Sequence, residues 1–302
     1  MRTLDLFCGC GGLSLGFELA DFELVAAADN WPEALAVYRQ NFQHPALLMD
    51  LSDVENALAQ LAPLRPEVVI GGPPCQDFSS AGKRDEDNGK GALTVAYARL
   101  VAGLSPSIFV MENVPTIVGK RKLQEAKAIL QAAGYGLSST VLDASLCGVP
   151  QRRKRFFMVG ILGGKDGELL PTLQGGLAKV PLTVRQALGN EITVDYYYRH
   201  PRSYARRGIF SVDEPSPTVR GVNRPMPPGY QLHSNDAVQT KEGIQPLTTL
   251  QRARIQTFPA DFCWNGPRTV VEQLVGNAVP VKLAQHVAER LLTWISTEWV
   301  YK

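Results

Sequence analysis

One cysteine stands out because of the residues that come before it. Cys75 follows two glycines and two prolines, and these follow the apolar run Val68–Ile70, which is typical of a strand. Consecutive prolines fix φ and stiffen the approach to the thiol. A free cysteine is usually buried and inert, whereas a thiolate with a positive neighbour or a lowered pKa is a strong nucleophile. Cys75 is therefore a candidate nucleophile at the end of a strand.

An acid and a basic run elsewhere in the chain are partners that such chemistry needs. Glu112 ends the apolar run Ile108–Met111, where a bare carboxylate is costly to bury, so it should be paired or have a raised pKa. Such an acid can donate a proton to a ring nitrogen. In strand geometry Gln151, Arg153 and Arg155 share one face and could converge on one pocket. The alternatives are an ordinary salt bridge for the glutamate and a solvated face or phosphate contact for the basic run.

A glycine-rich turn indicates that a nucleoside binds nearby. The predicted strand Thr3–Phe7 runs into a turn that contains Gly9, Gly11 and Gly12, and glycines let backbone amides approach a ligand closely. The dinucleotide spacing G-x-G-x-x-G fails, because its last position is Ser14. The aromatic ring at the end of the strand suggests stacking on a base. The alternative is a tight strand-to-helix turn without a ligand.

Two acids at the next strand ends strengthen this prediction. Asp29 lies about 20 residues after the glycine turn, where it can accept hydrogen bonds from ribose hydroxyls. Asp50 ends the following strand and is placed to contact an adenine amino group. Each acid could instead cap the helix that follows it. An aromatic residue and two acids at three successive strand ends favour a nucleoside.

The elements that position these residues alternate along the first half of the chain. Predicted helices lie between predicted strands, which indicates an α/β fold with a doubly wound parallel sheet. Ligands bind beyond the carboxyl ends of the strands in such sheets. The predicted strands are Thr3–Phe7, Leu24–Ala28, Ala46–Met49, Val68–Ile70, Ile108–Met111, Ser138–Leu142 and Phe156–Ile161, and the predicted helices are Pro32–Phe42, Val54–Leu61, Thr94–Leu104 and Leu123–Ala133.

The chain changes character after Ile161. Residues 163–245 are rich in Pro, Gly, Arg and Tyr without a helical period, which favours a loop-rich or small β domain. Order returns at Leu247, and Val281–Trp294 is predicted to form an amphipathic terminal helix. From Glu191 to Arg268 there are ten Lys or Arg against seven Asp or Glu, compared with 21 against 22 in the rest. This surplus is a weak indication that a polyanion binds there.

Composition excludes several classes of protein. The 302 residues, 45% of them hydrophobic, suffice for one large domain or for a large domain with a smaller companion. The first residues lack the pattern of a signal peptide, and no apolar run is long enough to cross a membrane, so we expect a cytoplasmic protein. The five cysteines form no CxxC pair and lie far in sequence from the four histidines, so neither a metal site nor a disulfide framework is expected.

Together the motifs resemble those of DNA (cytosine-5) methyltransferases of the bacterial restriction-modification type. They follow the usual order of the family and span nearly the whole chain. The matching segments are Asp5–Gly12, Pro74–Gln76, Glu112–Val114, the alternating Gln151, Arg153 and Arg155, Leu247–Thr248 with Arg254–Pro259, and Gly276–Pro280. Each segment alone is weak evidence for the family, whereas the whole set is highly specific.

The resemblance implies a Rossmann-like methyltransferase sheet and S-adenosyl-L-methionine as cofactor, with no metal. Cys75 would add to carbon 6 of cytosine, and Glu112 would contact the ring nitrogen and the exocyclic amine. Arg155, with Arg153, would hold the carbonyl oxygen and the catalytic loop. The target base must leave the duplex, because it cannot otherwise meet thiol and cofactor together. The implied cofactor-binding residues are Phe7, Gly9, Gly11, Gly12, Asp29, Asn30, Asp50, Leu51, Pro73, Asn277 and Ala278.

The resemblance also divides the chain. Residues 1–190 with 271–302 would form the catalytic, cofactor-binding domain, with the terminal helix beside the first strand, and residues 191–270 would form the target-recognition domain. Within the latter, Tyr196–Arg207 mixes aromatic residues and arginines and suits DNA contact or an ordinary surface equally. Thr218-Val219 resembles a Thr-Leu pair found there in relatives. Double-stranded DNA is the implied partner and a monomer is favoured, while the target sequence and a cognate restriction endonuclease stay open.

Two residues depart from the family pattern. Position 81 is Ala, where some relatives have a polar residue that helps to fill the space of the flipped base, and Gln251 stands where many have Glu, with an effect expected to be structural. Three rival interpretations stay open. A tRNA-modifying cytosine-5 methyltransferase shares the Cys and Glu motifs, although the basic, Pro- and Gly-rich segment favours DNA. The intact Cys75, Glu112, Arg153 and Arg155 argue against an inactive DNA-binding homologue. A nicotinamide dehydrogenase would need a different glycine spacing.

Overall fold

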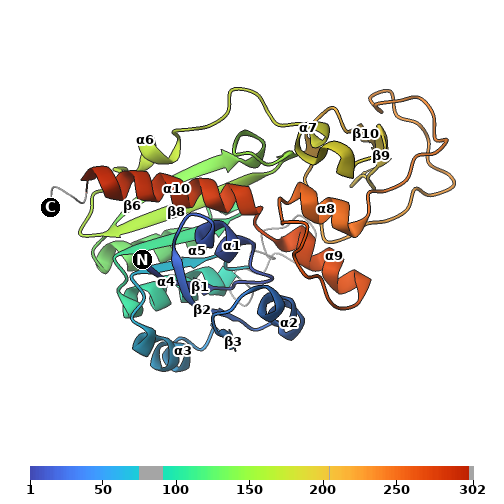
Figure 1. Cartoon of the computed structure of the whole chain (residues 1–302). Helices are drawn as coiled ribbons and strands as arrows, with labels where there is room; N and C mark the ends of the chain where they lie inside the picture. The colour runs from blue at the N-terminus through green and yellow to red at the C-terminus, as the bar shows by residue number, and fades with distance from the viewer. Residues whose placement is uncertain (75–90, 204, 299–302) are drawn as a thin grey trace.

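A seven-stranded sheet forms the centre of the protein (Figure 1). The computed structural model describes residues 1–74, 91–203 and 205–298. In spatial order the strands are β3 (Ala46–Leu48), β2 (Glu23–Asp29), β1 (Arg2–Leu6), β4 (Val68–Gly71), β5 (Ile108–Asn113), β8 (Lys154–Leu162) and β6 (Tyr135–Asp143). All seven strands predicted from the sequence are present, and the predicted α/β fold with a doubly wound sheet is confirmed.

One strand departs from the predicted parallel arrangement. The pairs among β1 to β5 are parallel, but β8 is antiparallel to both of its neighbours, β5 and β6. The chain leaves β6 through a single 3-10 turn, Ala144–Leu146, and the two-residue strand β7 (Gln151–Arg152) before β8 begins. Without a crossover helix between them, β6 and β8 can only run in opposite directions.

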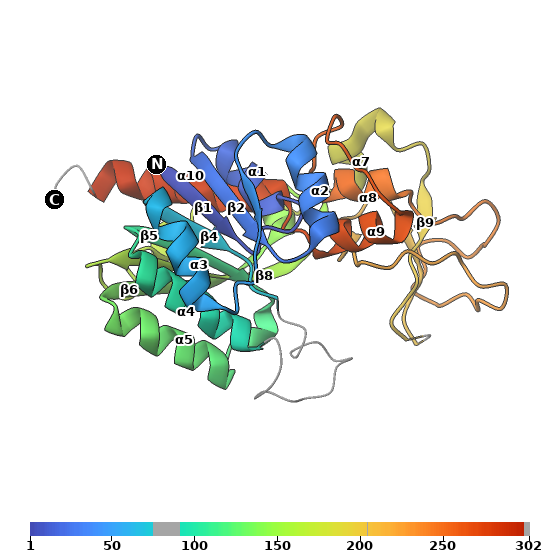
Figure 2. The same cartoon turned by 90° about the horizontal axis from the view of Figure 1, so that it is seen from below.

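Helices cover both faces of the sheet (Figure 2). One face carries α3 (Val54–Leu61), α4 (Gly91–Leu104) and α5 (Arg121–Ala132), and the other carries α1 (Gly12–Glu18) and α10 (Val281–Glu298). Side chains alternate between the faces along each strand. In β5, for example, Val110 faces α10 whereas Phe109 and Met111 pack with α4 and α5.

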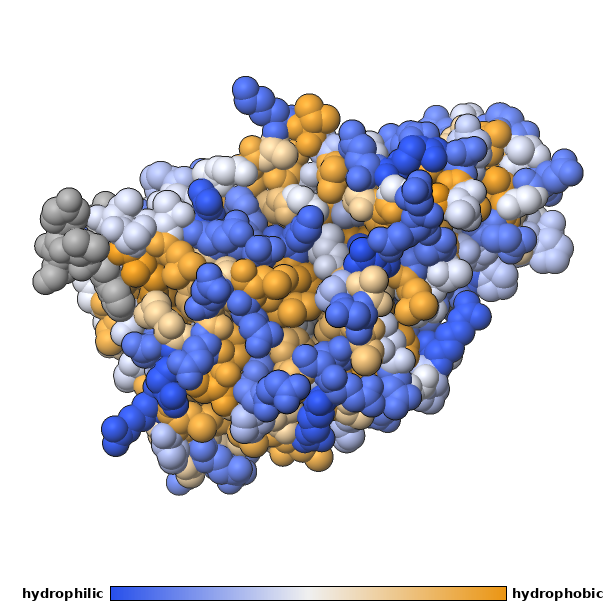
Figure 3. All heavy atoms as spheres, in the orientation of Figure 1, coloured by the Kyte–Doolittle hydropathy of each residue, from blue (hydrophilic) through white to orange (hydrophobic). Residues whose placement is uncertain are grey.

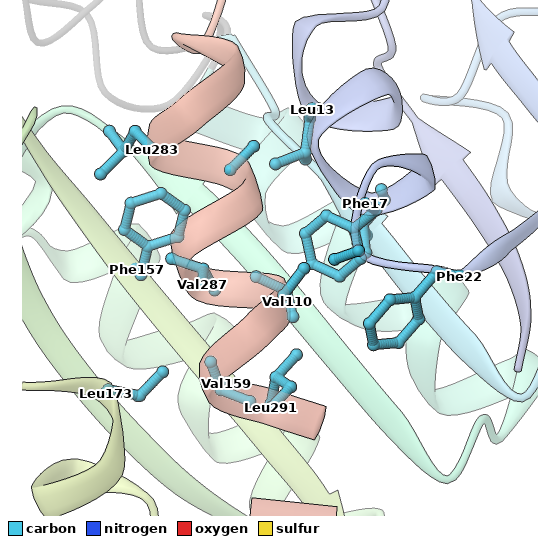
Figure 4. Close-up of a cluster of buried hydrophobic side chains, with 14 of the residues drawn as sticks. Leu13, Phe17, Phe22, Val110, Phe157, Val159, Leu173, Leu283, Val287 and Leu291 are labelled. Carbon is cyan, nitrogen blue, oxygen red and sulfur yellow. The ribbon is translucent and has the colours of Figure 1, made fainter. Parts of the chain in front are cut away.

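The terminal helix α10 belongs to the same core as the first helix (Figure 4). Its buried residues Leu283, Val287 and Leu291 pack with Phe17 of α1 and with Phe157 of β8. Burial of each large apolar side chain contributes roughly 1.5–3 kcal/mol. The last part of the chain therefore lies beside the first, as the family resemblance implies, and the terminal helix predicted from the sequence is present.

After β8, the short helix α6 (Leu170–Leu173) still packs on the core of the large sheet. The segment that follows forms a smaller body with little regular structure. Its elements are α7 (Val184–Leu188), β9 (Tyr196–Tyr198), β10 (Ile209–Ser211), β11 (Ser216–Pro217), α8 (Thr249–Ile255) and α9 (Arg268–Asn277). A separate hydrophobic cluster joins Tyr197 and Phe210 to Leu188 of α7 and Val275 of α9. Helices on either side of the expected recognition domain, residues 191–270, thus share its core, and that boundary stays a prediction.

Gln251, which departs from the family pattern, caps the start of α8. Gln251 is the third residue of α8 and completes a capping box with Thr248, because its side-chain oxygen accepts the Thr248 N–H at 2.9 Å. A glutamine thus does here what a glutamate would do, and its effect is structural.

Among the described residues, no helix combines the length and hydropathy needed to cross a membrane.

A chain of buried polar groups joins the first strand to the first two helices. The Ser14 hydroxyl donates a hydrogen bond of 2.5 Å to Asp5, and the Tyr38 hydroxyl of α2 (Pro32–Asn41) donates one of 2.7 Å to Ser14. The Tyr38 hydroxyl also lies 2.6 Å from Nε2 of His44. A glycine at position 14 would lose both of its bonds, which explains why the dinucleotide pattern ends in serine here.

Asp5 is the buried end of this chain of groups. Burial raises its pKa to about 8, because the carboxylate would lie away from water, and the hydrogen bond from Ser14 offsets only part of that cost. The second carboxyl oxygen, Oδ1, has no hydrogen-bond partner among the described residues. Asp5 is therefore mostly protonated in the folded protein at pH 7.

We predict that Asp5→Asn makes folding stability less dependent on pH. An unfolded aspartate titrates near pH 4. Between pH 4 and 8 the folded wild type therefore holds a proton that the unfolded chain has released, and its stability falls as pH rises through this window. Asparagine stays neutral, so its presence removes this dependence. Across the window, the free energy of unfolding of the variant should rise relative to that of the wild type by on the order of 4 kcal/mol.

Urea denaturation of both proteins between pH 5 and 8 measures this difference. Asp53→Asn, which changes the exposed N-cap residue of α3, is the matched control for the loss of one carboxylate. A difference between Asp5→Asn and wild type that stays constant over this pH range would contradict the protonated state of Asp5.

Candidate active site

A cavity of about 750 Å³ lies beyond the carboxyl ends of strands β1 to β5. The residues after these strands form one wall, and α9 with the residues that follow it forms another. Of the residues predicted from the sequence, Phe7, Gly9, Gly12, Asp29, Asn30, Asp50, Leu51, Pro73, Glu112, Arg153, Arg155, Asn277 and Ala278 line it. Residues from both ends of the chain therefore meet at one site.

Two predicted residues do not appear in this lining. Gly11 adopts φ +94° against the rings of Phe42 and Tyr38, so a side chain there would collide with α2 and its end. The lack of a side chain lets the turn pack on α2, and a cofactor contact of Gly11 stays a prediction. Cys75 lies outside the described residues, as does Ala81.

The glycine turn presents an open surface to the cavity. Gly9 has φ +55°, and a β-carbon built on it would have no neighbour within 4 Å. Phe7 also adopts a positive φ of 60°, which is uncommon for an aromatic residue and is tolerated where the surroundings fix it. Both residues line the cavity, so the turn offers a ring and exposed backbone to a ligand.

The two acids at strand ends are held by backbone and hydroxyl groups. Asp29 accepts the Gly9 N–H at 2.8 Å and the Trp31 N–H at 2.9 Å, so it joins the glycine turn to the start of α2. Burial raises the pKa of Asp29. Asp50 is exposed and accepts both the amide and the hydroxyl of Ser52. It does not cap α3, because the N-cap residue of that helix is Asp53.

Glu112 and Arg155 form a buried ion pair on the cavity wall. The Arg155 Nε lies 2.8 Å from the Glu112 Oε1, and both side chains are largely buried. Burial raises the pKa of Glu112, while the charges of Arg155 and Arg153 act in the opposite direction. The sequence predicted a glutamate that is paired or has a raised pKa, and the structure combines the two. The carboxyl group is thus a site that can hold or release a proton.

The residue after Glu112 fixes the approach to the candidate nucleophile. The Asn113 side chain donates a hydrogen bond of 3.1 Å to the Pro73 carbonyl, and its oxygen accepts the Val114 N–H. Pro73 and Pro74 line the cavity together with Glu112. The chain therefore reaches residue 74 at the wall that carries the acid. This role of Asn113 could not be predicted from the sequence, because an asparagine at a strand end has no chemistry of its own that would mark it.

Arg153, which lies between β7 and β8, is surrounded by backbone carbonyls, whereas Arg155 pairs with an acid. Its guanidinium is 1% exposed and donates hydrogen bonds to the carbonyls of Val219, Gly276 and Ala278, at 2.9, 3.0 and 3.0 Å. Gln151 accepts the Val219 N–H at 2.8 Å. Gln151 and Arg153 therefore hold both backbone groups of Val219. Arg153 also lines the cavity, so it links the recognition segment to the site.

No group of His, Cys, Asp and Glu residues suited to a metal ion occurs within residues 1–74, 91–203 and 205–298. Cys8 and Cys10 line the cavity, but burial raises the pKa of both thiols, Cys10 to about 12. Neither is a thiolate at neutral pH. The groups that remain for chemistry on this wall are the acid and the arginine of the ion pair.

Comparisons with known proteins identify the family. A family model described as C-5 cytosine-specific DNA methylase matches residues 1–293. The Type II methyltransferase M.HindV of Haemophilus influenzae is 50% identical over 295 residues, with 97% of both chains covered. M.HgiDI of Herpetosiphon aurantiacus is 51% identical over 296 residues, with 98% of this chain and 96% of the relative covered. The crystal structure of the S. pombe Dnmt2 methyltransferase shares the fold, with a TM-score of 0.73 at 20% identity over 97% of this chain and 98% of the other. The chain therefore belongs to the C-5 cytosine-specific DNA methylases and is a DNA methyltransferase.

Proposed function

We propose that the protein transfers a methyl group from S-adenosyl-L-methionine to carbon 5 of a cytosine flipped out of a specific double-stranded DNA sequence. The observation that carries this proposal is the buried pair of Glu112 and Arg155, which lies on the same cavity wall as Pro73 and Pro74. The residue that follows these prolines is Cys75, the proposed nucleophile. An acid, a cation and a thiol are then available to one pyrimidine.

The cavity lining fits the cofactor. The Phe7 ring offers a stacking surface for adenine, the open backbone at Gly9 admits a ligand, and Asp29 keeps acceptor capacity for ribose hydroxyls. Asp50 at the third strand end would receive the adenine amino group. When bound, S-adenosyl-L-methionine supplies the methyl group on a sulfonium.

The protein's own groups would act on the cytosine ring. The Cys75 thiolate forms a bond to carbon 6 while Glu112 holds a proton at the ring nitrogen, which places electron density on carbon 5. After carbon 5 has accepted the methyl group, it loses its proton, and the bond between sulfur and carbon 6 breaks to release the thiolate. Arg155 keeps Glu112 oriented and binds the carbonyl oxygen of the base.

The base must leave the duplex to enter this cavity. The proposed target-recognition domain, residues 191–270, would hold the duplex, and Gln151 and Arg153 tie it to the catalytic wall through Val219. The Type II relatives favour duplex DNA as substrate and a restriction-modification setting. A monomer with a cognate restriction endonuclease as partner is the arrangement that we propose.

Tritium transfer from labelled S-adenosyl-L-methionine tests the substrate. We expect label in duplex DNA and none in tRNA, and sequencing of DNA from transformed cells should then map 5-methylcytosine to one sequence. Label confined to tRNA would contradict the proposal and support an RNA methyltransferase.

Cys75→Ser should abolish methyl transfer, because a serine hydroxyl is a far weaker nucleophile than a thiolate. Binding of the cofactor should persist, as calorimetry can check. A duplex with 5-fluorocytosine at the mapped site should trap wild-type protein as a covalent adduct and leave the variant free. Methylation by Cys75→Ser at the wild-type rate would remove the thiol from the mechanism.

Glu112→Gln should slow the chemical step by roughly 10²-fold, which is the usual loss when acid-base assistance is removed. The amide can still hydrogen-bond to the base but cannot hold the proton. Single-turnover kinetics separates this step from DNA binding. Glu125→Gln, on the half-exposed side of α5, is the control that removes an acid elsewhere. A variant as fast as the control would show that Glu112 only binds.

A further inference from the structure

A cluster of arginines lies in the recognition segment beside the cavity. It comprises Arg199, Arg202, Arg220, Arg224 and Arg252. Burial together with the charges of neighbouring arginines lowers the pKa of Arg199 and of Arg252 to about 10, and the same causes lower the pKa of Arg220. Figure 3 shows that hydrophilic side chains cover much of the surface around β9 and β10. The cluster therefore concentrates positive charge partly out of contact with water.

Among the described residues, most of this charge has no acid to balance it. Arg252 pairs with the buried Glu272, and Glu272 also has Arg268 as a neighbour at 3.6 Å. Arg199 donates to the Thr218 carbonyl at 2.8 Å and Arg220 donates to the His200 carbonyl. Within the described residues neither Arg199 nor Arg220 forms an ion pair. A half-buried cation without a counter-charge is costly, and an anionic ligand removes that cost.

The backbone holds Arg220 at a fixed place next to the cavity. Val219, the residue before it, is bonded at both backbone groups by Gln151 and Arg153. Gly221, the residue after it, packs so closely on Gly276 that a side chain on Gly276 would overlap it. Gly276 lines the cavity. A DNA strand whose target base enters the cavity would thus carry its neighbouring phosphates past Arg220.

We propose that Arg199 and Arg220 bind a backbone phosphate of the target strand close to the flipped cytosine, with Arg202 and Arg224 adding to the local positive potential. This inference rests on the proposed function. A phosphate suits this place because three guanidinium-bearing residues, Arg199, Arg220 and Arg252, line one crevice. The guanidinium groups are also anchored to carbonyls, as positioning contacts to phosphates require, and several like charges converge on one place.

The salt dependence of DNA binding tests this proposal. Affinity of wild type and Arg220→Gln is measured by fluorescence anisotropy between 50 and 200 mM salt, on a duplex with the mapped methylation site and on a scrambled duplex. Loss of one phosphate contact should reduce the slope of log affinity against log salt by about 0.9. We expect both duplexes to be weakened by a similar factor, on the order of tenfold at low salt.

Arg185→Gln is the matched control. It removes the same charge from the same region, but Asp195 and Asp213 already neutralise Arg185 at 2.6 and 2.5 Å. Its salt slope should equal that of the wild type, and thermal denaturation checks that both variants fold. Arg220→Lys, which keeps the charge, should restore most of the slope.

A methylphosphonate scan keeps the proposal testable even if the variants fold poorly. Neutral methylphosphonates replace single phosphates near the target cytosine, and one position should weaken wild-type binding while leaving Arg220→Gln unaffected. An unchanged slope with no sensitive position would overturn the inference. Loss of affinity limited to the cognate duplex would also overturn it, in favour of base reading. If wild type transfers no methyl group to duplex DNA, the proposed function itself fails, whereas normal transfer with either of these results refutes only the phosphate site.

Discussion

The ion pair between Glu112 and Arg155 constrains how the rest of the sheet is built. Burial disfavours the charged carboxyl of Glu112, and a single guanidinium at 2.8 Å offsets part of that cost. The two residues come from different strands, β5 and β8. Glu112 lies at the carboxyl end of β5, and its partner Arg155 is the second residue of β8. The start of β8 must therefore lie beside the end of β5. Only an antiparallel β8 meets this condition, because the first residues of a parallel strand would lie at the far end of the sheet.

The same short stretch of chain also sets the position of the recognition segment. Gln151, Arg153 and Arg155 alternate with residues that face the other way. The first two hold the amide and carbonyl of Val219, and the third holds Glu112. A second buried hydrogen bond, from Gln151 to Gln256, extends this network to α8. A shift of the recognition segment would therefore pull on the strand that carries Arg155. The cavity wall with Glu112 and the segment around Val219 are thus joined through these bonds.

The sequence predicts well where one local pattern suffices and less well where distant segments meet. Short apolar, β-rich runs predict all seven strands of the sheet, and the residues that follow β1 to β5 do line one cavity. Chain direction failed for β8, because the pattern of a buried strand is the same in either direction. The packing of Gly11 on Phe42 and Tyr38 could not be predicted, since a glycine needed for packing looks the same in sequence as one that faces a cavity. The bonds of Ser14 to Asp5 and Tyr38 likewise depend on the meeting of β1, α1 and α2.

Charge along the site is arranged for two ligands of opposite sign. At the end formed by β1 to β3, the cavity meets Asp29 and Asp50. At the other end, Arg153 and Arg155 line the wall, and the arginine cluster begins one residue beyond Val219. A sulfonium is favoured by the acids and DNA phosphates by the arginines. Glu112 stands between the two regions, where burial raises its pKa and arginines act against the rise. Both effects act on one carboxyl group, at the point where the proposed reaction needs an acid.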